Sequence, residues 1–422
     1  MPVNLPPNLP ALKPGWAWVK LGDVIEKIPT TNKKLKQKDY FEEGKYPVID
    51  QGQKLIGGYS NNDELTLDCD LPVIVFGDHT KVKKFINFKF IPGADGIKVI
   101  KPKSCFDPKL FYYFLYCIQL PDKGYARHFQ FLEKEDIPLP PLPEQKKIVA
   151  KIEELFSELD SGVANLRKAK EQIKTYRQSV LAHAFTGRLH QDSQDLQIDR
   201  IKESSKSSNL ENPGSDILPD NWKWVKLGEV ISDFKRGPFG STIKKSFFID
   251  KGFKVYEQKN AIYKDHNLGD YYISEDKYNE LEGFAVKGGD YLVSCSGTIG
   301  RIYKLPSTTP RGIINQALLR MRINDRQINE NFFVYLFESE LFQRKIIVES
   351  RGSAMKNLAG VKELKQIEFV LPPLPQQSYI VEEIEKRFSV ADNLEKAIDE
   401  SLNRSNKLRQ SILKKAFEGN LV

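Results

Sequence analysis

The sequence predicts an α+β protein of two similar halves, each a strand-rich mixed α/β globular segment followed by one long helix. Three observations predict this class. A 51-residue segment from Leu139 to Leu189 recurs from Leu371 to Leu421, with identical residues at 21 positions of an ungapped alignment. A shorter segment that begins at Trp16 recurs at Trp222. Apolar residues of the long segments follow a seven-residue spacing, which is typical of paired helices in a coiled coil.

The two repeats divide the chain into five parts. We predict globular domains over 1–138 and 217–370, long helices over 139–189 and 371–422, and a connection over 190–216. The connection is rich in Ser, Asn and Asp and carries six acidic against three basic side chains. This composition is typical of a flexible, solvated linker.

The globular domains open with the shorter repeat, WAWVKLGDVI at 16–25 and WKWVKLGEVI at 222–231, which contain all four tryptophans. Its alternating aromatic residues predict a half-buried strand whose role is core packing. Later in each domain a predicted strand delivers an acid–Gln pair to a loop, Asp50-Gln51 in the first half and Glu257-Gln258 in the second.

Further similarities follow in the same order in both halves. A strand at 71–76 or 291–295 leads into a Gly/Thr turn and then a basic residue. A short aromatic helix is predicted at 110–116 and at 331–337, and an Arg-led loop at 127–130 and at 351–356. The two domains differ in detail, so we expect them to recognise different targets.

Each long helix is marked at both ends. Pro143 and Pro375 suit the first helical turn, and Gly187 and Gly419 suit the residue after the last turn. The predicted coiled-coil seam consists of Ile152, Phe156, Leu159, Val163, Leu166, Ile173 and Val180 in the first helix and Ile384, Phe388, Ala391, Ile398 and Ile412 in the second. The alternative, two amphipathic helices each packed on its own domain, is favoured by polar residues near the seam such as Lys170, Arg177 and Ser405.

Charge and cysteine usage limit the class of protein. The net charge is +8, and because 190–216 carries −3, the remainder carries +11, a mild bias toward polyanions such as nucleic acid. The four cysteines, Cys69, Cys105, Cys117 and Cys295, show no CxxC spacing and no pairing with histidines. We therefore expect reduced thiols, no zinc site and a cytoplasmic location. The start of the chain lacks the pattern of a signal peptide, and the longest apolar run, 110–118, is too short to span a membrane.

Catalytic motifs are weak. Asp250, Glu257 and Lys259 have the order of a D…ExK nuclease site, but the first half has Gly52 where the second has Lys259. The sequence contains no Walker A motif, no GxGxxG and no Asn/Asp-Pro-Pro-aromatic motif of the amino-methyltransferase type. We predict a non-catalytic chain that holds no metal and no cofactor of its own.

The remaining candidates are loop residues suited to DNA. Arg, Gln and Asn can contact base edges in the major groove, and lysines neutralise phosphates. Asn315 and Gln316 have a structural alternative, the satisfaction of backbone groups at a strand end. The first half offers Gln51, His79, Thr80, Lys81, Lys83, Lys84, Arg127 and Gln130. The second half offers Arg236, Lys244, Lys245, Gln258, Thr298, Arg301, Arg311, Asn315, Gln316, Arg351 and Lys356.

Together these features resemble the specificity (S) subunit of type I restriction-modification systems. The resemblance covers the whole chain and rests on the two WxWVKLG[DE]VI starts, FGDHT at 76–80, SGTIGR at 296–301, IINQALLRMR at 313–322, and the two LPPLPxQ openings at 139–145 and 371–377. The single motifs are weak, whereas their order and duplication are specific.

The resemblance implies two target-recognition domains, each recognising half of a split site in double-stranded DNA, held apart by an antiparallel coiled coil. It implies assembly with two methyltransferase (modification) subunits that carry S-adenosylmethionine and methylate adenine, and with restriction subunits that use ATP and Mg²⁺. The alternatives are a stand-alone DNA-binding regulator and a nuclease or methyltransferase that acts alone.

Overall fold

The computed structural model describes residues 11–93, 96–121, 124, 126–186, 221–239, 242–349 and 356–422. The chain forms two compact units. Unit 1 comprises Met1–Lys168 and Ile398–Val422, and unit 2 comprises Ala169–Ala397. Both long helices are thus divided between the units. The predicted connection over 190–216 lies outside the described residues.

Unit 1 is built on two sheets. Its four-stranded antiparallel sheet has the order β2 (Ile25–Ile28), β8 (Ile97–Pro102), β5 (Val73–Gly77), β6 (Lys83–Ile86). The smaller sheet has the order β4 (Gly58–Ser60), β3 (Tyr46–Ile49), β7 (Ile91–Pro92). The opening repeat forms β1 (Ala17–Lys20), which pairs with β9 (Asp136–Leu139) just before the long helix. Every residue of β5 is buried, so this central strand anchors the loops at its ends.

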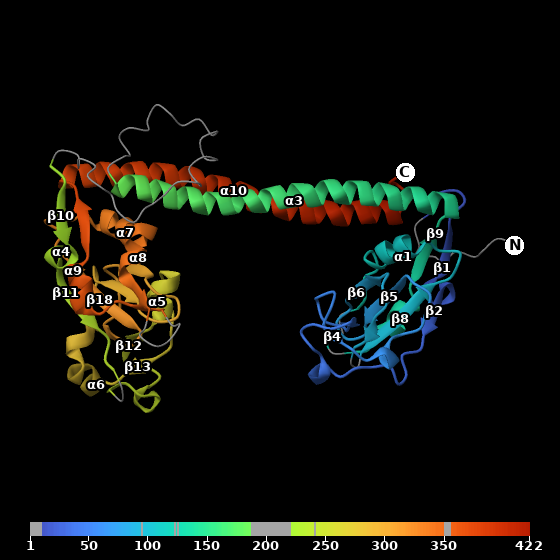
Figure 1. Cartoon of the computed structure of the whole chain (residues 1–422), viewed down its shortest axis with the longest axis horizontal. Helices are drawn as coiled ribbons and strands as arrows, with labels where there is room; N and C mark the ends of the chain where they lie inside the picture. Colours follow the sequence, from blue (N-terminus) through green and yellow to red (C-terminus); the bar gives the residue numbers. More distant parts are fainter. Residues whose placement is uncertain are drawn as a thin grey trace. The chain divides into compact units, whose positions relative to one another are not determined.

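Unit 2 repeats this plan, with one additional strand, β14, in the second sheet. Its first sheet has the order β11 (Ile231–Arg236), β18 (Leu318–Ile323), β15 (Tyr291–Ser294), β16 (Ile302–Lys304). The second has the order β13 (Tyr272–Ile273), β12 (Phe253–Tyr256), β17 (Gly312–Ile314), β14 (Ala285–Val286). Two further pairs are β10 (Lys223–Lys226) with β21 (Glu368–Leu371) and β19 (Ile347–Glu349) with β20 (Lys356–Leu358). The duplication seen in the sequence is therefore also a duplication of strand order. Figure 1 labels β6, β5, β8 and β2 of the first sheet of unit 1.

Short helices join the strands. The aromatic helices predicted from the sequence are α1 (Pro108–Leu115) and α7 (Glu330–Glu338). The others are α2 (Phe129–Leu132), α4 (Leu227–Val230), α5 (Gln258–Tyr263), α6 (Glu275–Glu280), α8 (Glu340–Ile346) and α9 (Val361–Gln366). Two places predicted as loops are partly helical. In the 127–130 segment α2 begins at Phe129, whose N–H donates to the carboxylate of Asp78 (2.8 Å), and Gln258 begins α5. In the described part of the chain no helix is long and apolar enough to cross a membrane.

The two long helices contribute opposite ends to each unit. Helix α3 (Leu142–Phe185) begins in unit 1 and ends in unit 2, whereas α10 (Leu374–Phe417) begins in unit 2 and ends in unit 1. The core of unit 1 includes Ile148 and Ile152 from the start of α3 and Ile412 and Ala416 from the end of α10. Because the start of one helix meets the end of the other, the helices pair in antiparallel fashion within the unit.

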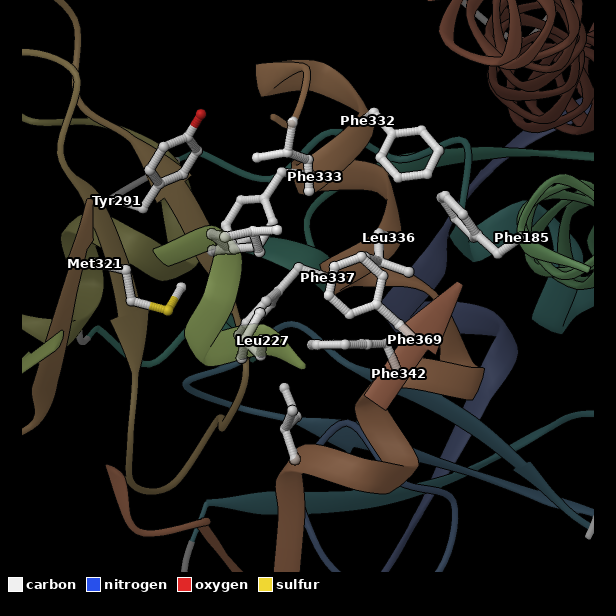
Figure 2. Close-up of a cluster of buried hydrophobic side chains, with 14 of the residues drawn as sticks. Phe185, Leu227, Tyr291, Met321, Phe332, Phe333, Leu336, Phe337, Phe342 and Phe369 are labelled. Carbon is white, nitrogen blue, oxygen red and sulfur yellow. The ribbon is translucent and has the colours of Figure 1, made fainter. Parts of the chain in front are cut away.

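The core of unit 2 is completed by the end of α3 and the start of α10. Its core includes Val180 and Phe185 from α3 and Ile384 from α10. In Figure 2, Phe185 faces Phe332 of α7 with an edge-on contact of 5.2 Å between ring centroids. Helix pairing and packing on the domains, which the sequence presented as alternatives, therefore occur together. Of the predicted seam, Ile152, Ile173, Val180, Ile384, Ala391 and Ile412 are buried, and Phe156, Leu159, Val163, Leu166, Phe388 and Ile398 are half-buried.

Equivalent glutamines attach each long helix to its domain. The side-chain oxygen of Gln145 accepts the N–H of Asp107 (2.6 Å), and its amide group donates to the carbonyl of Cys105 (2.9 Å). Gln377 repeats this with the N–H of Asn329 (2.7 Å) and the carbonyl of Gln327 (3.1 Å). Since both glutamines are fully buried, the contacts satisfy polar groups that water cannot reach.

Candidate nucleic-acid interface

Loops that follow β3, β5 and β7 meet at one end of the sheets of unit 1. The N–H of Asp78, just after β5, donates to the carbonyl of Gly96 (2.6 Å), and the N–H of Gly93, just after β7, donates to Ile49 at the end of β3 (2.7 Å). Segment 126–130 joins them, because the N–H of His128 donates to the carbonyl of Asp78 (2.8 Å). Residues 50–52, 78–81, 93, 96 and 126–130 are called the unit 1 loop surface below.

Three of the predicted side chains meet on this surface. The Thr80 hydroxyl donates to the carbonyl of Gln51 (2.7 Å), and the backbone N–H of His79 donates to the side-chain oxygen of Gln51 (3.4 Å). The imidazole Nδ1 of His79 lies 3.2 Å from the carbonyl of Ala126. Gly96, with φ of +90°, leaves no room for a larger residue, since a Cβ there would lie 2.7 Å from the Gln51 amide nitrogen.

Arg127 and Gln130 are exposed on the same surface. The residues beneath them are fixed, because the buried His128 lies with Nδ1 3.0 Å from the carbonyl of Asp78. Gln130 donates through its amide group to the carbonyl of Arg127 (3.0 Å). Asp78 and His128 shape this loop through their hydrogen bonds. Neither was among the residues predicted from the sequence, although both stand beside predicted residues.

The lysines of β6 have other surroundings. Lys83 lies with its ammonium 5.0 Å from the ring centroid of Tyr116, and burial lowers the pKa of this lysine. Lys84 is 4% exposed and forms an ion pair with Asp50 (3.4 Å). Burial lowers the pKa of Lys84, whereas Asp50 opposes this shift. Lys81 is half-buried in the turn, with φ of +59°. Neither β6 lysine is therefore arranged as a freely solvated phosphate ligand.

Unit 2 presents a corresponding surface at the same end of its sheets. The Ser296 hydroxyl, just after β15, donates to the side-chain oxygen of Gln258 (3.2 Å). The Ser294 hydroxyl donates to the carbonyl of Thr298 (2.6 Å) and accepts the N–H of Arg301 (3.0 Å), so this serine shapes the turn. The side chains of Thr298 and Arg301 are exposed on it. Residues 257–258, 296–301 and 315–317 are called the unit 2 loop surface.

The remaining candidates of unit 2 divide into two groups. Asn315 uses its side-chain oxygen to accept the N–H of Ala317 (3.0 Å), which is the structural alternative considered for it, while Gln316 is exposed beside it. Arg236, at the end of β11, is half-buried, and its guanidinium is 3.5 Å from the carbonyl of Leu358. Lys356 is exposed at the start of β20, and Lys244 and Lys245 are exposed beyond β11. Arg351 lies outside the described residues.

Arg311 is not brought to this surface. It precedes β17, so it lies at the opposite end of that strand from Asn315. Its guanidinium lies 5.2 Å from the ring centroid of Phe253 and 5.1 Å from that of Tyr278. Because stacked arginine is held by aromatic rings, Arg311 has a structural role that sequence position alone did not reveal.

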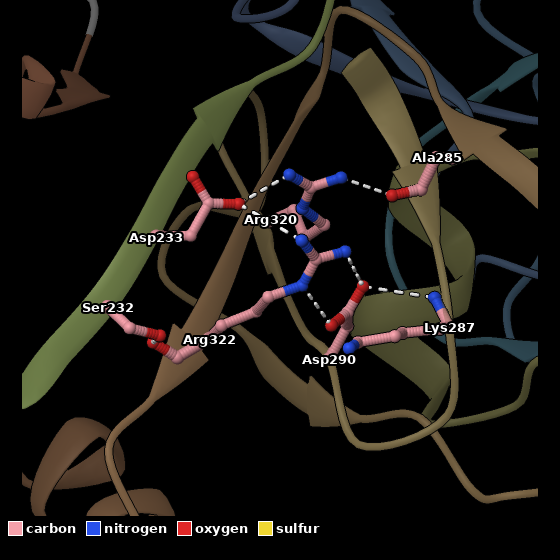
Figure 3. Close-up of polar contacts among 7 residues, drawn as sticks. All are labelled: Ser232, Asp233, Ala285, Lys287, Asp290, Arg320 and Arg322. Carbon is pink, nitrogen blue, oxygen red and sulfur yellow. Dashed lines mark hydrogen bonds and ion pairs between the residues drawn. The ribbon is translucent and has the colours of Figure 1, made fainter. Parts of the chain in front are cut away.

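Two arginines of the LLRMR segment are likewise structural (Figure 3). Arg320, 5% exposed, donates to Asp233 of β11 and to the carbonyl of Ala285 on β14, so it ties the two sheets of unit 2 together. Arg322 contacts both oxygens of the buried Asp290 (2.7 and 3.1 Å). This network faces the space between the sheets rather than the loop surface.

Two similar units, each with Arg, Gln and hydroxyl side chains on loops at one end of its sheets, define a class of proteins with two duplicated α+β domains. A family model described as the type I restriction modification DNA specificity domain matches residues 13–174 and 219–404. The chain therefore belongs to this family.

Known proteins are similar over both units. The EcoBI specificity subunit of a type I restriction enzyme from Escherichia coli is 30% identical over 287 residues, which cover 68% of this chain and 58% of that protein. The EcoDI specificity subunit from Escherichia coli is 24% identical over 416 residues, 96% of this chain and 89% of that protein. The EcoBI alignment, like those to the StySPI and EcoKI specificity subunits, thus spans 58% of the relative's length.

Solved structures share the fold. A chain from a structure of the type I R-M system, described for its complex assembly and conformational transition, aligns with a TM-score of 0.65 at 20% identity, covering 98% of this chain and 100% of that one. The HsdS subunit from Thermoanaerobacter tengcongensis aligns with a TM-score of 0.51 at 20% identity, covering 98% and 99%.

Proposed function

We propose that this chain is the DNA-recognition subunit of a type I restriction-modification complex, in which the unit 1 and unit 2 loop surfaces each recognise one half of a split target. The observation that carries the proposal is the duplicated loop surface, where Gln51 and Gln258 occupy equivalent places beside exposed Arg127 and Arg301. Gln and Arg suit base edges in the major groove. The membership of both units in the specificity family supports the same conclusion.

The chemistry is assigned to partner subunits. We propose that two methyltransferase subunits supply S-adenosylmethionine and that restriction subunits supply ATP-dependent cleavage with Mg²⁺, while this chain is non-catalytic and works in the cytoplasm. Within the described residues, Lys259 of the D…ExK motif forms an ion pair with Glu257 (2.9 Å), and no group of three or more His, Cys, Asp or Glu side chains is placed to hold a metal ion.

Methylome sequencing tests the proposal. A host expressing the chain with its methyltransferase subunits should acquire methylation at one bipartite sequence, and loss of this chain should abolish it. Purified alone with Mg²⁺ and S-adenosylmethionine, the chain should neither cut nor methylate DNA. Methyl transfer by the isolated chain, removed by a point substitution within it, would overturn the non-catalytic assignment and favour the enzyme alternative.

A further inference from the structure

Gln51 and Gln258 have equivalent positions in the two units. Each follows a strand of the second sheet of its unit that has a parallel neighbour, β3 beside β7 and β12 beside β17. Each uses its side-chain oxygen to accept a hydrogen bond from the turn after the central strand, from His79 N–H or from the Ser296 hydroxyl. A glutamine side-chain amide carries both an acceptor oxygen and a donor nitrogen, and these are the two kinds of group that a base edge can pair with.

An acidic residue precedes each glutamine, and in unit 1 this residue is Asp50. Its carboxylate accepts the N–H of Gly52 (2.9 Å) and forms the ion pair with the buried Lys84 (3.4 Å). The space around it is filled, since a Cβ at Gly93 would lie 2.6 Å from the Asp50 Cβ. Asp50 is therefore fixed by charge and by packing, and the backbone that carries Gln51 is fixed with it.

In unit 2 the acidic residue is Glu257, and the lysine that pairs with it does not come from the strand equivalent to β6. Lys259 lies two residues further along the chain, with its ammonium 2.9 Å from the Glu257 carboxylate. The N–H of Glu257 donates to the side-chain oxygen of Asn260 (2.7 Å). Tyr303 has the register position on β16 that Lys84 has on β6, so unit 2 lacks that lysine. The two units thus reach the same acid–lysine pair by different routes.

We propose that Lys84 and Lys259 are positioning residues, each holding the acidic residue that precedes a base-contacting glutamine. Gln51 and Gln258 then make equivalent contacts, one in each half-site, and adenine is the base whose N6 and N7 edge matches a glutamine amide. The inference rests on the proposed function. It changes the role of Lys84 from a phosphate contact to a support beneath the loop surface.

The experiment measures base discrimination in the complete complex with methyltransferase subunits. Methylation kcat/KM is determined for the cognate DNA and for a panel in which each specified base pair is replaced in turn. Gln51→Ala should lower discrimination at one base pair of one half-site by roughly 5- to 150-fold. Lys84→Met should lower discrimination at that same base pair, and the double variant should lose no more than Gln51→Ala alone.

Lys83→Met is the matched control, because Lys83 is the neighbouring lysine of the same strand and contacts Tyr116 instead of Asp50. It should leave the discrimination profile unchanged. Gln258→Ala and Lys259→Met should repeat the pattern at one base pair of the other half-site. Because Lys259 is 41% exposed, Lys259→Met should fold, so it tests the positioning role even if Lys84→Met does not fold.

Three results separate the inference from the proposed function. If Gln51→Ala relaxes one base pair while Lys84→Met and Lys259→Met change none, or change all equally, the positioning role is wrong and the proposed function stands. If neither glutamine variant alters base preference, the pair of equivalent contacts is wrong. If the complex methylates without any sequence preference, the proposed function itself fails.

Discussion

The guanidinium of Arg409 lies 4.3 Å from the ring centroid of Phe156, and it also forms an ion pair with Asp160. Arg409 comes from the end of α10 and both partners come from α3. The same contact occurs in unit 2 with the helices exchanged, where Arg177 of α3 lies 5.0 Å from the ring of Phe388 of α10. Each unit thereby fixes the register of its own helix pair.

Substitution of these arginines should destabilise their units. Arg409→Ala removes a cation–π contact and one ion pair, and Arg177→Ala removes a cation–π contact and ion pairs with Asp392 and Glu395. We expect a loss of about 1 kcal/mol for each, because exposed ion pairs contribute little. The loss should be greater for Arg177, which is 22% exposed, than for Arg409, which is 38% exposed. Urea unfolding checks this, with the exposed Arg404→Ala of α10 as the control. Equal effects of all three substitutions would contradict the register role.

The exposed arginines of the loop surfaces should act on separate half-sites. Arg127→Ala should weaken recognition of one half of the methylated sequence and Arg301→Ala that of the other, each by about 1–3 kcal/mol if the contact is bidentate to a base. Methylome sequencing of each variant gives the result. A substitution that relaxed both halves equally would exclude one unit per half-site. A uniform loss for all sequences would indicate a phosphate contact instead.

In unit 2, removing Asp233 and removing Arg320 should destabilise the fold by different amounts. Asp233→Ala leaves Arg320, 5% exposed, without its carboxylate, and we expect a cost of about 3 kcal/mol. Arg320→Met instead leaves Asp233, which is 37% exposed and 3.5 Å from Arg322, so the cost should be under about 1.5 kcal/mol. Chemical denaturation of both variants provides the comparison. A larger loss for Arg320→Met would show that the link to Ala285 dominates.

Cys295 should be inert at neutral pH. Burial raises the pKa of its thiol to about 11, although nearby Arg236 opposes the shift. Between about pH 8.5, the ordinary thiol pKa, and about pH 11, Cys295 therefore keeps its proton in the folded state and loses it in the unfolded state. The contribution of Cys295 to stability is complete below pH 8.5 and falls as pH rises through that range.

Alkylation by iodoacetamide followed by mass spectrometry tests this pKa. In the native chain at pH 8 modification of Cys295 should be slow, and it should accelerate as the pH approaches 11. Urea should abolish the protection at pH 8, which provides the control. Rapid labelling of native Cys295 at pH 8 would show that the strand end opens readily.

Much of the architecture could be predicted because duplication exposes it. Gln145 and Gln377, Phe156 and Phe388, and Arg177 and Arg409 are identical between the repeats, and all six make the contacts that join helix ends to domains or to each other. Between Ser161 and Tyr176 the repeats share no residue. The identical residues of the two repeats therefore lie at the ends of the helices, where these contacts with the domains and with the other helix are made.

The loop surfaces could be predicted only in part. Residue type and strand-end position selected Gln51 and Gln258 as candidate DNA contacts, and the structure places each beside the turn after the central strand of its unit. Position could not show that Lys84 is buried against Asp50 or that Arg311 stacks on aromatic rings, since these depend on partners distant in sequence. Ser296 was not predicted from the sequence, because its role is a single hydrogen bond to Gln258, which follows a strand of the other sheet.

The division of the long helices has a consequence for the order in which the protein is completed during synthesis. Unit 2 is continuous from Ala169 to Ala397, so all of it has been synthesised before the last part of the chain. Unit 1 starts first, yet its core requires Ile412 and Ala416 from the final turns of α10. Since domains tend to fold as their residues emerge, the core of unit 1 stays incomplete until the end of α10 has been synthesised. The first unit to be made is the last to be finished.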